Sequence, residues 1–235
     1  MEICFLPVYI TLKVIFQVKG MLKMKEKSNK LVWIAAAVLF LVIAAVYGFI
    51  SNKSGPADAE LNLTRFQSLL KSAEQGDAES QFFAGKCYAE GKDVQKDEAL
   101  AVQWYQRAAD QGHARALCSL GLCYFKGNGV KQDYAKAAEC FRKSAERKYV
   151  PAFSNSGVCY YKGYGVAKDY KKAFELFQLA SETGYVPAQY NLAECYELGR
   201  GVAKDLNKAV ALYKKAASAG FAAAQKKLQQ IESQK

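Results

Sequence analysis

Apolar positions recur along most of this chain at spacings of three and four, which is the period of one face of an α-helix. Residues 114–126 and 134–146 show the pattern clearly, and the segment between them contains Gly127 and Gly129. Glycine tolerates the left-handed backbone that ends a helix and forms a tight turn. The pattern therefore predicts a helical hairpin, with apolar positions at Leu117, Leu120, Gly121 and Tyr124 in the first helix and at Ala137, Phe141 and Ala145 in the second.

Four columns of residues show that this hairpin repeats with a period of 36 residues. They are Asp97, Asp133, Asp169 and Asp205; Val94, Val130, Val166 and Val202; Ala101, Ala137, Ala173 and Ala209; and Tyr88, Tyr124, Tyr160 and Tyr196. The aspartates precede the second helices and are predicted N-caps, because a carboxylate accepts hydrogen bonds from the free amides of a first helical turn. One hairpin alone cannot bury its apolar surface, so the four units are expected to stack.

The predicted fold is an all-α solenoid closed by a helix at each end. The domain spans residues 61–235, and its repeats lie at about 76–111, 112–147, 148–183 and 184–219. Residues 61–75 resemble a second helix without a first, and residues 221–233 resemble a first helix without a second. We therefore expect ten helices, of which the outer two cap the array.

The N-terminal part of the chain has a different character. Residues 31–50, "LVWIAAAVLFLVIAAVYGFI", carry no charge and are long enough to cross a hydrocarbon core of roughly 30 Å as a helix. Residues 1–30 are rich in lysine, so the positive-inside rule predicts a cytoplasmic basic tail and an exported repeat domain. Residues 1–20 read as an over-extended start or as a tail without fold, and residues 51–60 read as a flexible linker. A cleaved signal peptide is the alternative to the transmembrane helix, because Ala57-Asp58-Ala59 has the form of a cleavage site.

The chain has a formal net charge of +11 at pH 7. Residues 76–235 contribute 24 Lys and Arg against 17 Asp and Glu. A solvated basic surface is the simplest interpretation, and contact with anionic lipid or acidic partners is the alternative. Nucleic acid is not an expected partner of an exported domain.

Four cysteines recur with the same period, at Cys87, Cys123, Cys159 and Cys195. Equivalent residues of neighbouring repeats lie about 8–10 Å apart, whereas a disulfide needs Cα atoms within roughly 7 Å. A linear column also cannot bring four ligands onto one zinc ion, so these cysteines are expected to be small packing residues. Cys118 and Cys140 differ, because they lie symmetrically about the turn near Gly129 and form a candidate disulfide in an oxidising compartment.

No catalytic constellation stands out in the sequence. His113 is the only histidine, and no recognisable Cys or Ser nucleophile motif accompanies it. The glycines belong to periodic turns rather than to a phosphate-binding loop. We therefore expect no catalytic residues, no metal and no cofactor.

The pattern A-x-x-x-L-G-x-x-Y-x-x-G-x-G-V-x-x-D-x-x-K-A resembles the Sel-1-like repeat (SLR), a longer-looped relative of the tetratricopeptide repeat. The second repeat meets it with Ala116, Leu120, Gly121, Tyr124, Gly127, Gly129, Val130, Asp133, Lys136 and Ala137. The departures are Asp93 and Lys148 at turn glycines and Ala193 at the helix glycine. The resemblance covers about residues 61–235 and implies a right-handed superhelix that serves as an adaptor for other proteins, in bacteria often within the cell envelope.

In related repeats the first helix of each hairpin lines a concave groove, so its non-repeating positions are the candidate binding residues. They are Phe83, Phe125, Lys126, Asn155, Tyr161, Lys162, Tyr190 and Asn191. Asparagine amides suit a peptide backbone, aromatic rings offer apolar contact, and the lysines attract an acid or a carboxy terminus.

The resulting prediction is a scaffold or regulator, anchored in a bacterial inner membrane by one helix, whose periplasmic repeats bind a partner protein or peptide such as an envelope enzyme. A binder of cell-wall glycan or muropeptide is one alternative. A hydrolase of β-lactam or cell-wall compounds, as described for some cysteine-rich relatives, is another. Those relatives join each hairpin with a disulfide at positions that correspond here to Leu117 and Ala145, so that bond does not transfer.

Overall fold

The computed structural model describes residues 56–233, and the residues from Leu61 onward form one compact unit. The predicted cytoplasmic tail (1–30) and transmembrane helix (31–50) lie outside the described residues. Within residues 56–233, no helix is long and apolar enough to cross a membrane.

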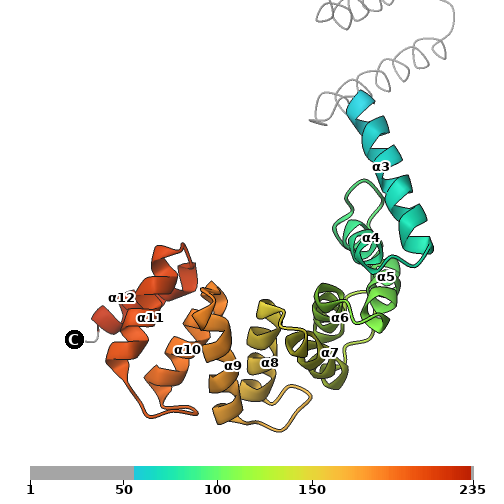
Figure 1. The fold of residues 1–235 in the computed structure, drawn as a ribbon. Helices are drawn as coiled ribbons and strands as arrows, with labels where there is room; N and C mark the ends of the chain where they lie inside the picture. Colours follow the sequence, from blue (N-terminus) through green and yellow to red (C-terminus); the bar gives the residue numbers. More distant parts are fainter. Residues whose placement is uncertain (1–55, 234–235) are drawn as a thin grey trace, which may run out of the picture. The chain divides into compact units, whose positions relative to one another are not determined.

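The described residues form ten α-helices and no strand, as expected (Figure 1). The helices are α3 (Pro56–Glu74), α4 (Ala78–Glu90), α5 (Glu98–Asp110), α6 (Ala114–Lys126), α7 (Tyr134–Glu146), α8 (Val150–Lys162), α9 (Tyr170–Glu182), α10 (Val186–Leu198), α11 (Leu206–Ser218) and α12 (Ala222–Glu232). Each hairpin pairs a first helix (α4, α6, α8 or α10) with a second helix (α5, α7, α9 or α11). Helix α3 begins at Pro56, so the last five residues of the predicted linker 51–60 are helical.

Local signals end and begin these helices where the sequence places them. The carboxylates of Asp133, Asp169 and Asp205 accept from the amides three residues later at 2.9–3.0 Å, which confirms the predicted N-caps. The glycine after each first helix adopts a left-handed conformation and donates its amide to the carbonyl of the periodic cysteine. The bounds of the helices are therefore fixed largely by local chemistry.

The two helices of a hairpin approach closely because a glycine faces an aromatic ring. A Cβ at Gly121 would lie 2.7 Å from the ring of Phe141, and one at Gly157 would lie 2.6 Å from the ring of Phe177. Such distances are too short for carbon atoms in contact, so the ring occupies the space that a side chain would need. Phe141 and Phe177 are each 2% exposed and lie at the centre of their hairpins.

Neighbouring hairpins are joined through the turns. A Cβ at Gly165 would lie 2.1 Å from the carbonyl oxygen of Tyr134, and one at Gly201 would lie 2.0 Å from that of Tyr170. Each turn therefore packs its backbone against the start of the preceding second helix. This contact sets the spacing between successive units of the solenoid.

The departures from the repeat pattern keep the turn geometry. Asp93 and Lys148 replace glycine but adopt the same left-handed backbone, with φ of 62° and 61°. For an L-residue this conformation costs roughly 1–2 kcal/mol. The turns at Asp93 and Lys148 therefore keep the shape of the glycine-containing turns, at the cost of local backbone strain.

We predict that Lys148→Gly raises the free energy of unfolding by about 1 kcal/mol, because glycine adopts this backbone without the steric penalty. The reverse change at the equivalent position, Gly184→Ala, should lower it by about the same amount. A Cβ at Gly184 meets no atom of the described part of the chain within 4 Å, so only the backbone (φ 85°) is affected. Urea denaturation followed by circular dichroism measures both. A Lys148→Gly protein no more stable than the parent would contradict the assigned strain.

Candidate binding groove

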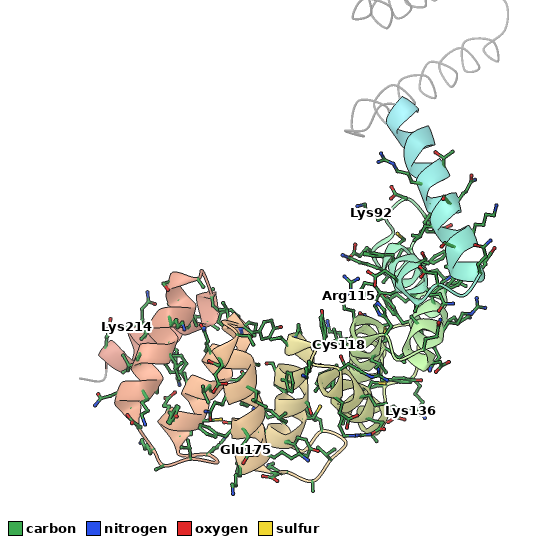
Figure 2. All side chains as sticks on the ribbon, in the orientation of Figure 1. Lys92, Arg115, Cys118, Lys136, Glu175 and Lys214 are labelled. Carbon is green, nitrogen blue, oxygen red and sulfur yellow. The ribbon has the colours of Figure 1, made fainter. Side chains whose placement is uncertain are left out.

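The first helices line the inner side of the arc formed by the hairpins. Figure 2 shows Arg115 and Cys118 of α6 on the inner side, and Lys136 and Glu175, from second helices, on the outer side. Helices α8 and α10 also contact each other directly, although they belong to different hairpins. We call this inner side of the arc, lined by inward-facing residues of the first helices, the groove.

An aromatic and cationic cluster occupies the N-terminal end of the groove. The guanidinium of Arg115 lies over the rings of Phe82 and Phe83, at 4.6 and 5.2 Å from their centres. The carboxylate of Glu79 pairs with Arg115 and lies 2.7 Å from His113 Nε2, and the hydrogen bond with His113 lowers the pKa of Glu79. Phe82 is buried, whereas Phe83 is 38% exposed, and its role as a binding residue stays a prediction.

Two asparagines form the middle of the groove floor. Asn155 Nδ2 donates to Cys118 Sγ, and Asn191 Nδ2 donates to Ser154 Oγ, both at 3.4 Å. Each asparagine therefore donates a hydrogen bond to a residue of the preceding hairpin, and the two bonds are one repeat apart. No other hydrogen bond is recorded for either side chain among residues 56–233, so each retains a carbonyl oxygen and an N–H for a ligand.

Ionisable groups gather at the C-terminal end, between α8, α10 and α12. Glu197 accepts from the Tyr213 hydroxyl at 2.7 Å and from Lys227 Nζ at 3.0 Å. Glu194 is partly buried, which raises its pKa, and it faces the charges of Lys162 and Lys227. Glu194 is not among the residues predicted from the sequence, although its column reads Lys86, Leu122, Val158 and Glu194 and so also breaks the repeat.

Tyr190 shares this end of the groove. Its ring packs at 5.4 Å from the rings of both Tyr213 and Phe221, and the side chain stays partly exposed. The Tyr190 ring is therefore held in one orientation by its neighbours and still leaves part of its surface open to a ligand.

Phe125 and Tyr161 are engaged in contacts between hairpins that the sequence pattern does not predict. The Tyr161 side chain is only 5% exposed, and its hydroxyl accepts from Arg200 Nη1 at 2.8 Å. Phe125 packs edge-on against Tyr134 and Tyr164, with ring centres at 5.2 and 5.4 Å. The flat aromatic surface expected at these two residues is not available at Tyr161, which is buried, and is reduced at Phe125, which is partly buried. Lys126 and Lys162 are exposed at the groove margin.

The described cysteines are free thiols. Cys159 and Cys195 of the periodic column are 1% and 0% exposed, which fits small packing residues. Burial raises the pKa of Cys118, Cys123 and Cys159 to about 11, so these thiols are weak nucleophiles near neutral pH. Within residues 56–233, no group of three or more His, Cys, Asp or Glu has the geometry of a metal site.

A cavity of about 800 Å³ opens on the convex side, between α5 and α7. Leu117, Leu120 and Tyr124 of α6 line it together with Cys140 of α7. Cys140 is the smallest residue in its column, which otherwise holds Trp104, Leu176 and Leu212. The cavity is therefore explained by the small side chain at this position. A comparison of side-chain volumes along each column would have indicated it.

Fold and groove together define an all-helical repeat solenoid of the tetratricopeptide-like class. The family model of the Sel1 repeat matches residues 78–113, 114–149, 154–185 and 186–221, and the chain belongs to this family. Sel1-repeat proteins are protein-interaction scaffolds, and most relatives are non-catalytic. The Sel1 repeat family and the all-helical solenoid fold that the sequence predicts are thus confirmed.

Two solved structures have the same fold. A Sel1 repeat protein from Oxalobacter formigenes is 36% identical, with a TM-score of 0.68, over 72% of this chain and 67% of that one. A protective antigen present in uropathogenic Escherichia coli strains, displaying an SLR fold, is 36% identical with a TM-score of 0.67. The match covers 72% of this chain but only 36% of the antigen. Among curated proteins, no match was found.

The structure does not form the predicted disulfide between Cys118 and Cys140: both are free thiols, and Cys118 Sγ accepts a hydrogen bond from Asn155. The disulfide therefore stays a prediction for protein in an oxidising compartment. Peptide mass spectrometry of unreduced protein isolated from an oxidising compartment should find one species that joins the two residues. Cys140→Ser is the control that must abolish it. Alkylation of both thiols without prior reduction would rule the bond out.

Proposed function

We propose that this protein is a membrane-anchored interaction scaffold whose concave groove binds an extended segment of a partner protein. The non-repeating residues of the first helices supply the contacts. Residues 31–50 would hold the chain in a bacterial inner membrane, with the N-terminus in the cytoplasm and the repeats in the periplasm. An envelope enzyme under regulation or assembly is the class of partner that this location suggests.

The two asparagines of the groove floor carry the proposal. One lies in each of the third and fourth hairpins, and packed helices lie about 8–10 Å apart. An extended peptide advances about 3.3 Å per residue, so successive asparagines meet its backbone roughly every three residues. Because side-chain amides pair with peptide groups of any sequence, this floor supports binding of backbone, with specificity supplied elsewhere.

Side chains at the two ends of the groove supply that specificity. Phe83 with Arg115 forms an aromatic and cationic surface at one end, and Tyr190 with Glu194 forms an aromatic and acidic surface at the other. Lys126 and Lys162 stand exposed along the margin between them. A partner segment with apolar side chains at both ends fits this arrangement.

The anchor is supported by the sequence alone, through the uncharged run of residues 31–50 and the lysines that precede it. Flotation of the full chain with vesicles of neutral lipid tests it. We expect the protein to remain in the lipid fraction after alkaline extraction. Complete release of the protein from the vesicles would contradict the anchor.

We predict that the double variant Asn155→Ala with Asn191→Ala loses partner binding by about tenfold or more, because each amide contributes about 0.5–1.5 kcal/mol in hydrogen bonds. Its free energy of unfolding should change by less than about 1 kcal/mol, since both intramolecular bonds are long at 3.4 Å. Quantitative mass spectrometry of proteins that co-purify with the tagged full chain measures the loss.

A double variant that removes exposed amides from the second helices, Gln103→Ala with Gln178→Ala, is the matched control. A partner recovered equally with the parent and both double variants would contradict a role for the groove asparagines.

A further inference from the structure

Positive charge is concentrated on one edge of the solenoid, where the turns inside the second, third and fourth hairpins lie. The segments are 126–136, 162–172 and 198–208, and together they form the basic turn edge. Their cations are Lys126, Lys131, Lys136, Lys162, Lys168, Lys171, Lys172, Arg200, Lys204 and Lys208, and their acids are Asp133, Asp169 and Asp205.

The remainder of the same hairpins is nearly neutral. Between residues 114 and 221, the cations outside the edge are Arg115, Arg142, Lys143, Arg147, Lys148, Lys214 and Lys215, and the acids are Glu139, Glu146, Glu175, Glu182, Glu194 and Glu197. The excess of positive charge therefore belongs to the edge and not to the surface in general. The corresponding turn of the first hairpin, residues 90–100, is acidic on balance, so the edge begins at the second hairpin.

The turns of the edge are contiguous in space. Tyr164 of the third hairpin stacks on Tyr134 of the second, with ring centres 4.8 Å apart. In the same way, the Arg200 guanidinium of the fourth hairpin lies 5.3 Å from the ring centre of Tyr170 in the third. The charges thus follow one continuous row across three hairpins.

Most of these cations are available to a partner. All nine lysines are exposed, and among the described residues ion pairs are recorded for only two of them, with the N-cap aspartates: Lys136 with Asp133 at 4.0 Å and Lys208 with Asp205 at 3.5 Å. The capping carboxylates are already engaged by backbone amides. The local acids therefore do not neutralise the row.

Tyrosines lie directly beneath the lysines. Lys172 Nζ lies 4.3 Å from the ring centre of Tyr160, and the equivalent pairs Lys136 with Tyr124 and Lys208 with Tyr196 lie at 5.4 Å. Tyrosine, with an apolar ring and a polar tip, favours the headgroup level of a bilayer, and lysine is attracted to anionic lipid as a compact point charge. Arginine, which grips single phosphates in a bidentate manner, contributes only one of the ten cations.

We propose that the basic turn edge docks on the headgroups of an anionic membrane. A flat charged layer suits a row of separate lysines spread over three hairpins better than a compact ligand does. Docking would orient the groove margin, where Lys126 and Lys162 belong to both surfaces, toward the membrane. The proposal stands independently of the groove's partner and of the anchor.

The test uses the full chain with vesicles of phosphatidylcholine, with and without phosphatidylglycerol, and a photoreactive group on the lipid headgroup. Peptide mass spectrometry should find labels in segments 126–136, 162–172 and 198–208, several-fold stronger on the anionic vesicles. Added salt should weaken the labelling, since the Debye length falls from about 10 Å at 0.1 M to about 3 Å at 1 M.

The variant K131E/K168E/K204E changes one exposed lysine in each turn, none of which has a recorded ion pair among residues 56–233. It should lose at least about tenfold of the labelling, because each lysine near such a surface is worth about fivefold in affinity. The control K148E/K214E/K215E makes the same change of charge outside the edge and should keep it.

Equal labelling on both vesicle types, or equal loss in both triple variants, would overturn the proposal. Displacement of the labelling by a short DNA duplex at the same phosphate concentration would assign the edge to nucleic acid and would also overturn it. If the chain fails to associate with neutral vesicles, the anchor fails, while labelling on anionic vesicles still reports on the edge separately.

Discussion

The contact of an aromatic ring with a glycine, which the first three hairpins share, is the constraint on which the rest of the structure depends. At Gly121 and Gly157 the ring of Phe141 or Phe177 takes the space of a side chain, and the two helices pack at a fixed short distance. In the fourth hairpin Ala193 replaces the glycine opposite Tyr213, and both residues are still fully buried. With the hairpins held to one shape, identical turns stack on one another and the first helices line up along one side. The groove is a consequence of this regular packing.

Repeating and non-repeating positions have separate roles in such an array. The periodic aspartates cap helices, the glycines form turns and the alanines pack in the core. Substitutions at these positions therefore change the free energy of unfolding. Positions that differ from one hairpin to the next, such as Phe83, Asn155 and Tyr190, are the ones that we propose decide what the concave surface binds. Charge follows a third pattern, because lysines recur at the turns without taking part in the core. One chain therefore presents a groove and a charged edge on a common frame.

Most of the fold was predictable from the sequence because its signals are local. N-caps, turn glycines and the 36-residue period act within a few residues of the helix ends that they define. The engagement of Tyr161 was not predictable, because its partner Arg200 comes from the next hairpin and occupies a turn position with no fixed residue type. Gln189 gives a similar example. Its buried carbonyl oxygen has no hydrogen-bond partner among residues 56–233. In the first hairpin Gln111 donates to the equivalent Gln81, but Ala219 stands where Gln111 would be.

The central claim, that the concave surface is the partner-binding surface, is tested most directly by site-specific photocrosslinking in intact cells. A photoreactive phenylalanine derivative would replace Tyr190 in the groove and, in a second strain, Leu179 on the second helix α9, which is 50% exposed. The account predicts that one partner protein is captured from position 190 and is not captured from position 179. Capture of the same protein from position 179 alone, or equally from both positions, would contradict it.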